Sequence, residues 1–202
     1  TRNSTDVTRN AAVAVADGLG ATVFAIDVDS LVADYTQKVS DVLGRTLQWE
    51  TDDLALQNIQ ARVRSPSVWM LANVRGALLL ATSNRSEAAV GYTTMDGDTC
   101  GGIAPIAGID KAFLRHWLKW MEITGPQGLS PVSELQQVNA QQPTAELRPV
   151  GENQTDESDL MPYEVLDLIE RLAIRDKMMP QEIIEVLVTD SVVVSRRADR
   201  RQ

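Results

Sequence analysis

One short run of apolar residues constrains the fold of this chain more than any other feature. Residues 77–81 read Ala-Leu-Leu-Leu-Ala, and the polar stretch of residues 82–97, with hydroxyls, an amide and a carboxylate, follows directly. A continuous apolar run of this length is typical of a strand buried on both faces, as in a parallel sheet. Open parallel sheets bind ligands in the crevice beyond the carboxyl ends of their strands. The sequence therefore predicts an α/β fold with a ligand site in residues 82–97.

Helical patterns flank a second predicted strand at residues 21–28. A helix opened by Thr5 or Ser4 precedes it, and a helix that stops at Gly44 follows it, each with apolar residues at helical spacing. This alternation is typical of a parallel sheet with helices on both faces. Two strands make a marginal sheet for so many helices, so we expect a further strand before Thr1 and a sheet that is incomplete at the N-terminus. A further helix is predicted at residues 54–63, and a break at 65–66 then precedes a short helix that ends near residue 73. Other helices are predicted around residue 87 and at residues 111–122, 163–174 and 180–188.

Composition narrows the function. The 202-residue chain has a formal net charge of -9, which argues against nucleic acid as a partner, because phosphates demand clustered Lys and Arg. One cysteine, Cys100, excludes an internal disulfide and is compatible with a reducing cytoplasm. With one histidine, His116, no His/Cys metal site can form, so any metal is expected to be a hard cation such as Mg²⁺. No apolar run reaches the roughly 18 to 20 residues that span a bilayer, and no membrane partner is expected.

Two sets of polar residues have both a functional and an ordinary interpretation. Asn58 and Arg62 stand four residues apart and so share one face of their predicted helix. An amide and a guanidinium stacked in this way can grip a carboxylate or a planar amide-like ring. A solvated polar face explains the same spacing. Glu87 can ligate magnesium, or it can bond the backbone near the start of its helix.

Lys111 and a long polar segment are further candidates. Lys111 begins a helix, where the helix dipole disfavours a cation; this suggests an anionic partner such as a phosphate, with an ordinary surface lysine as the alternative. Residues 124–159 show little periodicity and are too long for an idle connector, which predicts a lid or a disordered loop. Within them, residues 143–149, Pro-Thr-Ala-Glu-Leu-Arg-Pro, suggest a loop that folds over a ligand. His116 is interpreted as structural, and residues 189–202 as a basic, solvated tail.

Six blocks of sequence, taken in order, resemble the synthetase domain of NAD synthetases, and most closely the glutamine-dependent kind. They are residues 57–64 (Gln-Asn-Ile-Gln-Ala-Arg-Val-Arg), 82–87 (Thr-Ser-Asn-Arg-Ser-Glu), 91–94 (Gly-Tyr-Thr-Thr), 97–98 (Gly-Asp), 143–149, and 154–157 (Gln-Thr-Asp-Glu) with 160–163 (Leu-Met-Pro-Tyr). No block decides alone, but six in the family's order are specific. On this resemblance residues 1–188 form part of an NAD synthetase domain.

The resemblance implies a Rossmann-like sandwich of the adenine-nucleotide α-hydrolase type that acts as a cytoplasmic homodimer. It implies NAD biosynthesis, in which ATP adenylates the carboxylate of deamido-NAD and ammonia then displaces AMP. In glutamine-dependent members a glutaminase domain supplies the ammonia, and these residues contain no such domain. The likeness assigns six residues to ligands and none to catalysis: Thr82, Lys111 and Thr144 to ATP; Glu87 to Mg²⁺ or deamido-NAD; and Asn58 and Arg62 to deamido-NAD.

The sequence also departs from the family pattern. The ATP-pyrophosphate loop, Ser-Gly-Gly-x-Asp-Ser, is not among these residues, and no late basic segment is recognisable after Val188. Met95 and Gly102 stand where ammonia-dependent members carry Lys and Asp. Because the missing loop cradles pyrophosphate, we do not expect these residues alone to synthesise NAD. Two alternatives stay open: another ATP-pyrophosphatase-type amidating enzyme, similar to GMP synthetases, and a non-catalytic module that binds nucleotide or dimerises.

Overall fold

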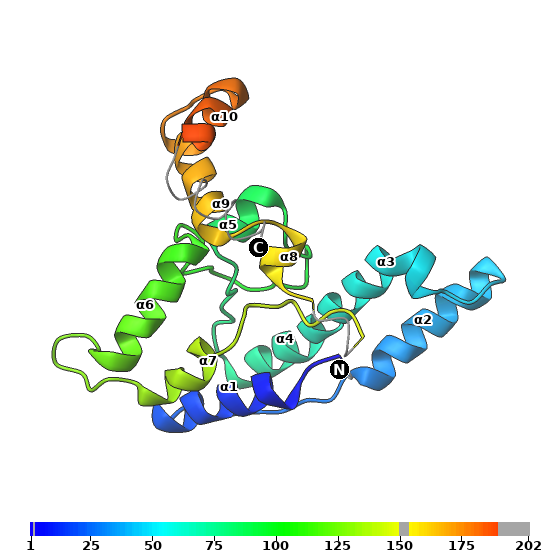
Figure 1. The fold of residues 1–202 in the computed structure, drawn as a ribbon. Coiled ribbons are helices and arrows are strands. Elements are labelled where there is room, and N and C mark those ends of the chain that lie inside the picture. The colour runs from blue at the N-terminus through cyan, green and yellow to red at the C-terminus, as the bar shows by residue number, and fades with distance from the viewer. Residues whose placement is uncertain (2, 150–153, 190–202) are drawn as a thin grey trace.

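The computed structural model describes residues 1, 3–149 and 154–189, and these parts of the chain are mainly helical (Figure 1). The first half holds α1 (Asp6–Gly18), α2 (Asp29–Leu43), α3 (Trp49–Arg62) and α4 (Arg64–Arg75). The middle holds α5 (Arg85–Val90), α6 (Lys111–Ile123), the 3-10 turn η1 (Ser133–Leu135), α7 (Gln136–Asn139) and α8 (Asp156–Asp159). The last part holds α9 (Tyr163–Glu170), a π-helical turn η2 (Arg171–Arg175) and α10 (Pro180–Thr189). The predicted basic tail lies outside the described residues from residue 190 onward.

Several helices begin or end at a capping residue. The Thr5 hydroxyl accepts the Thr8 N–H at the start of α1, and Gly44 closes α2 with a left-handed φ of 66°. The break predicted at residues 65–66 falls earlier: only Val63 separates α3 from α4. Pro66 then lies in the first turn of α4, where its missing N–H costs no hydrogen bond.

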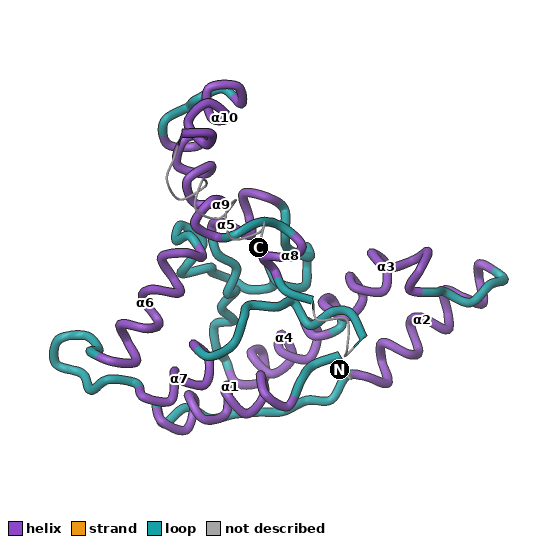
Figure 2. The backbone as a smooth tube through the Cα atoms, viewed as in Figure 1, coloured by secondary structure: helices purple, strands orange, loops and turns teal. Residues whose placement is uncertain are grey.

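The two predicted strands do not form as strands in the part of the chain that is described, and Figure 2 accordingly draws it as helix and loop. Residues 77–82 contribute one isolated parallel bridge, between Leu80 and Ile103, with an Ala81 N–H to Ile103 carbonyl distance of 2.8 Å. Residues 21–28 form a segment without regular secondary structure, and Phe24 in it is 48% exposed. The predicted strands do not form because a strand persists only when neighbouring strands make hydrogen bonds to its backbone N–H and C=O groups.

Glycine allows the single bridge to form. Gly101 packs against the backbone of Ala81 so closely that an added Cβ would overlap the Ala81 nitrogen. The Gly102 N–H then donates to the Leu79 carbonyl at 2.8 Å. This contact fixes the start of the polar stretch that follows residue 81.

The helices surround that polar stretch. In Figures 1 and 2, α2 and α3 form a hairpin on one side, α9 to α10 form an arm on another, and α1 lies along the base beside η1 and α7. α6 packs on η1, α7 and α9, and α5 packs on α9. A small core of Val28, Val32 and Val63 joins α2 to the α3–α4 junction. In the described ranges no helix is long and apolar enough to cross a membrane.

We predict that the cap of α5 is a local source of stability. Asn84 is almost fully buried; its side chain accepts the Glu87 N–H at 3.1 Å while the Glu87 carboxylate accepts the Asn84 N–H at 3.2 Å. Asn84→Ala should lower the free energy of unfolding by about 1 to 3 kcal/mol, because a buried donor loses its acceptor. Urea denaturation measures this. Asn10→Ala, on the exposed face of α1, is the control and should change stability by less than about 0.5 kcal/mol; equal effects of the two changes would contradict the prediction.

Candidate functional site

The site begins at the loop after Leu80. Residues 82–84 leave the bridge in extended form, and the reciprocal cap between Asn84 and Glu87 starts α5. In this cap one oxygen of the Glu87 carboxylate accepts the Asn84 backbone N–H, and the other oxygen faces α6. The ordinary interpretation of Glu87, a bond to its own helix start, is therefore present in the structure, and it leaves half of the carboxylate for another partner.

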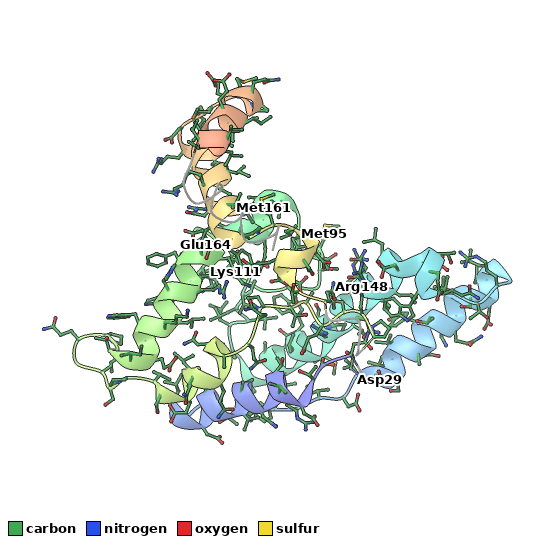
Figure 3. All side chains as sticks on the ribbon, in the orientation of Figure 1. Asp29, Met95, Lys111, Arg148, Met161 and Glu164 are labelled. Carbon is green, nitrogen blue, oxygen red and sulfur yellow. The ribbon has the colours of Figure 1, made fainter. Side chains whose placement is uncertain are left out.

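That partner is Lys111, the first residue of α6 (Figure 3). Its ammonium lies 3.1 Å from a Glu87 oxygen and 3.8 Å from Asp156, and it stands 5.8 Å from the centre of the Tyr163 ring. Asp110 caps the same helix by accepting the Phe113 N–H at 2.6 Å. The carboxylates of Glu87 and Asp156 thus offset the unfavourable position of a cation at a helix start. A phosphate that reached Lys111 would compete with them.

These residues border a pocket of about 680 Å³. Its lining includes Thr82, Glu87, Lys111 and Thr144. Apolar side chains of α6, among them Leu114 and Trp117, form part of the wall. The fold therefore brings together four of the six residues assigned from sequence, although they span positions 82 to 144. A pocket with an apolar wall and a few convergent polar groups is the usual form of a small-molecule site.

Asn58 and Arg62 lie outside the residues that line this pocket. The Asn58 side-chain oxygen accepts the Thr94 hydroxyl at 3.0 Å, and the Arg62 Nε donates to the Met95 carbonyl at 3.1 Å. Both therefore hold the turn at residues 94–98, which also contacts the start of α4 through Ser65. Their shared helix face exists as predicted, and their polar groups are engaged with backbone and side chains of that turn.

Sequence reasoning missed Arg64, the first residue of α4, which does line the pocket. Its Nη2 is buried without a hydrogen-bond partner in the described structure. Burial lowers the pKa of Arg64, while the charges of Asp98 and Glu146 act in the opposite direction. A guanidinium that lines a pocket is suited to an anion. The i, i+4 rule could not find Arg64, because it stands only two positions after Arg62 and therefore does not share its helix face.

Asp156 was also missed as a site residue. It is 4% exposed, it accepts the Tyr163 hydroxyl at 2.6 Å, and its second oxygen has no hydrogen-bond partner among described residues. Its N–H donates to the Pro143 carbonyl at 3.0 Å, next to Thr144. Asp156 therefore joins α8 and α9 to the loop that crosses the pocket. The block Gln-Thr-Asp-Glu was the available signal, but its contacts are too distant in sequence to be read from spacing.

Within the described ranges there is no group of three or more His, Cys, Asp or Glu side chains that could hold a metal ion. The nearest arrangement is the pair of carboxylates Glu87 and Asp156 around Lys111. Carboxylate oxygens can coordinate a hard divalent cation, but such a cation needs about six coordinating atoms. Phosphate oxygens of a bound molecule and water would have to supply the rest.

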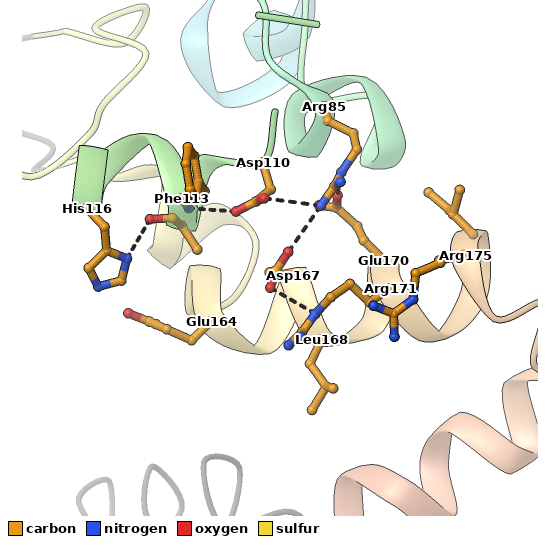
Figure 4. A pocket seen from close by; sticks show the side chains of 12 residues that line it. Arg85, Asp110, Phe113, His116, Glu164, Asp167, Leu168, Glu170, Arg171 and Arg175 are labelled. Atoms are coloured by element: carbon orange, nitrogen blue, oxygen red, sulfur yellow. Dashed lines mark hydrogen bonds and ion pairs between the residues drawn. The ribbon is translucent and has the colours of Figure 1, made fainter. Parts of the chain in front are cut away.

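A second pocket, of about 610 Å³, lies between α6 and α9 (Figure 4). At its floor the Arg85 guanidinium lies 3.3 Å from Asp110, 3.1 Å from Asp167 and 2.9 Å from Glu170. Burial and the charge of Asp110 raise the pKa of Asp167. Because its inner charges are paired with one another, this arrangement clamps α5, α6 and α9 together. His116, which was interpreted as structural, is on the rim and contacts the Ala112 carbonyl of its own helix at 3.0 Å.

Comparison with known proteins identifies a common family. The sequence pattern described as NAD synthase matches residues 1–202. The glutamine-dependent NAD(+) synthetase of Aquifex aeolicus is 42% identical over 134 residues, which is 66% of this chain and 22% of that protein. The crystal structure of the glutamine-dependent NAD(+) synthetase from Cytophaga hutchinsonii is 46% identical, with a TM-score of 0.79, over 94% of this chain and 28% of that one.

A more distant structure, glutamine-dependent NAD+ synthetase from Acinetobacter baumannii in complex with adenosine diphosphate, is 25% identical with a TM-score of 0.57. The match covers 95% of this chain and 31% of that one. Across the first curated relatives, the matched part is between 22% and 32% of their length. The chain therefore spans about a quarter of the length of the proteins it resembles.

We predict a loss of stability at alkaline pH that originates at Tyr163. Burial, and the bond to Asp156, raise the pKa of this phenol above its usual value of 10.0. Above pH 10 the unfolded chain releases this proton and the folded chain keeps it. The stability that Tyr163 contributes is therefore complete below pH 10 and falls as pH rises further, by roughly 1.4 kcal/mol per pH unit. Urea unfolding between about pH 9 and 11 should show a shallower decline for Tyr163→Phe; an unchanged slope would contradict this origin.

Proposed function

The chain belongs to the NAD synthase family, and from this we propose that it forms part of the substrate-binding region of an NAD synthetase. The parent reaction is the ATP-dependent amidation of deamido-NAD to NAD through an adenylated intermediate. One observation carries the proposal: the pocket collects Thr82, Glu87, Lys111 and Thr144 from four segments distant in sequence. The relative from Acinetobacter baumannii, which binds adenosine diphosphate, supports the nucleotide part.

In this proposal the pocket holds ATP. Thr82 and Thr144 contact the nucleotide, and Lys111 faces its phosphates. Arg64, which also lines the pocket, adds a second cation. Transfer at a phosphorus atom depends on alignment and on neutralisation of the leaving pyrophosphate, so two cations facing one pocket are the groups that the chemistry requires.

Magnesium is the metal that suits this site. The carboxylates of Glu87 and Asp156 are hard ligands, and both lie close to Lys111. In the proposal Glu87 holds the ion together with phosphate oxygens and water, which supplies further charge neutralisation. Asp156 lies beside it as a second acceptor.

Deamido-NAD is proposed to bind beyond the pocket, at the end of α3. Asn58 and Arg62 stand there beside the turn at residues 94–98. The guanidinium is exposed, so it can bind an anionic or carbonyl group of the dinucleotide. Ammonia for the second step comes, in this proposal, from glutamine through a glutaminase domain outside these 202 residues. The cysteine content of the chain agrees with a cytoplasmic location.

We also propose that residues 21–28 and 77–82 belong to a parallel β-sheet. Residues 21–28 and 77–82 expose apolar side chains, among them Val23, Phe24, Ile26 and Leu78. In an α/β sandwich these segments would lie next to further parallel strands, with helices covering both faces. The family match favours this enzyme over one similar to GMP synthetases. A non-catalytic nucleotide-binding module is the alternative that a binding experiment separates.

We predict opposite effects of two cation substitutions on two ligands. Lys111→Ala should weaken binding of ADP with Mg²⁺ and spare deamido-NAD, whereas Arg62→Ala should do the reverse. The loss of a charge-assisted contact costs about 2 to 3 kcal/mol, or roughly 30- to 150-fold in binding. Titration calorimetry of the chain with each ligand measures both effects.

Lys38→Ala is the control for this experiment, because Lys38 is an exposed lysine of α2 that pairs with Asp34. It should leave both affinities unchanged. Parallel losses for ADP and deamido-NAD in either variant would overturn the assignment. Binding of ADP without any binding of deamido-NAD would favour the nucleotide-binding module.

The proposed parent enzyme is a homodimer, and we predict that α4 forms its interface. Trp69, Met70 and Val74 are 40%, 68% and 83% exposed on this helix, which is more apolar surface than it needs against its own chain. An isologous contact would bury it against the same helix of a second copy. Sedimentation should show a dimer at about ten micromolar that Met70→Glu dissociates while ADP binding is retained. A chain that stays monomeric at that concentration would contradict the prediction.

A further inference from the structure

The loop that crosses the pocket is tied to the very start of α1 by one carboxylate. The Glu146 Oε1 atom accepts the Thr5 N–H at 3.3 Å, the Thr5 hydroxyl at 2.7 Å and the Thr8 hydroxyl at 2.8 Å. We call this set of contacts the Glu146 clasp. The Thr5 oxygen also accepts the Thr8 N–H, so it acts as helix cap and clasp donor at once. A carboxylate at a helix N-terminus is electrostatically favoured, because the free N–H groups there carry partial positive charge.

The clasp holds a backbone conformation that a glutamate does not adopt by itself. Glu146 has a left-handed φ of 49°, a region in which its Cβ is crowded by the carbonyl oxygen. Such conformations persist where surrounding contacts fix them, and they concentrate at ligand clamps. Here the fixing contacts come from the other end of the sequence, 138 and 141 positions away.

The turn at Glu146 determines where Thr144 lies. The Glu146 N–H donates to the Thr144 hydroxyl oxygen at 3.3 Å, and the Asp156 N–H donates to the Pro143 carbonyl at 3.0 Å. On the other side, the buried Asn3 side chain donates to the Leu147 carbonyl at 2.8 Å. Thr144 is thus held from both directions. Its hydroxyl oxygen receives a hydrogen bond, so its own proton is available to a ligand in the pocket.

We propose that Glu146 is a positioning residue for the nucleotide: its clasp on α1 fixes the turn that places Thr144 at the pocket. This inference rests on the proposed function, in which the pocket takes ATP. Glu146 itself does not line the pocket. It acts by reducing the number of conformations open to the loop, so that the nucleotide does not have to order the loop when it binds.

Titration calorimetry of the chain with ADP and Mg²⁺ tests the proposal. Glu146→Ala should weaken ADP binding on the order of tenfold, because binding must then order the loop. Glu146→Gln keeps an acceptor oxygen without the charge, so its loss should be smaller. Thr5→Val removes the clasp from the α1 side and should also weaken binding, whereas Thr5→Ser keeps both cap and donor and should recover most of the affinity. Glu50→Ala, which removes an exposed carboxylate of α3, is the matched control.

Hydrogen exchange separates positioning from simple stabilisation. Glu146→Ala should speed exchange in residues 141–149 while α6 and α9 keep their protection. A variant that melts at lower temperature but binds ADP as tightly as the unmodified chain would overturn the positioning role and leave the proposed function intact. An unmodified chain that does not bind ADP would overturn both. If Glu146→Ala does not fold, the Thr5→Val and Thr5→Ser pair decides: equal affinities reject the clasp.

Discussion

Paired charges between helices hold the described part of this molecule in place. In an α/β protein, ladders of backbone hydrogen bonds usually set the relative positions of the helices. Here one parallel bridge, at Leu80, is the sheet contact within the described residues. The Arg85 guanidinium and its three carboxylates join α5, α6 and α9, and Lys111 with Glu87 and Asp156 adds α8. Removing one member of such a set leaves a buried charge without its partner, and this lowers the free energy of unfolding strongly.

The same charges make the pocket responsive to its occupant. Two carboxylates lie beside Lys111, and the Glu87 carboxylate contacts both Lys111 and a backbone N–H. Under the proposed function, the phosphates of a nucleotide would attract Lys111, and the carboxylate oxygens that it leaves would then suit a divalent cation. A phosphate and a divalent cation would therefore bind such a site together, because either ion alone would break the pairing of Lys111 with its two carboxylates. Arg64 differs, since its Nη2 atom is buried and has no hydrogen-bond partner among the described residues.

Much of the helical structure could be predicted from sequence because its signals are local. Thr5, Asp110 and the residues 84–87 cap helices within a few positions, and Gly44 ends one. The predicted sheet is not confirmed within the described residues, because strand propensity describes one segment whereas a strand requires partners elsewhere. The ligand roles assigned from the resemblance stay predictions. Four of the assigned residues line one pocket, whereas Arg64 and Asp156 were not assigned, because contacts that are distant in sequence bring them to it.

The segment 21–28 has a consequence for the chain in solution. Its sequence, Ala-Thr-Val-Phe-Ala-Ile-Asp-Val, has high β-propensity and holds one charge, and the side chains of Val23, Phe24 and Ile26 are about half exposed. An unpaired segment of this kind is a template for intermolecular β-pairing and hence for aggregation. The Arg75 guanidinium, 4.7 Å from the centre of the Phe24 ring, and the carboxylates of Asp27 and Asp29 are the nearest features that oppose such stacking. Solubility of these 202 residues would accordingly depend on ionic strength, because salt screens the few charges that keep two such segments apart.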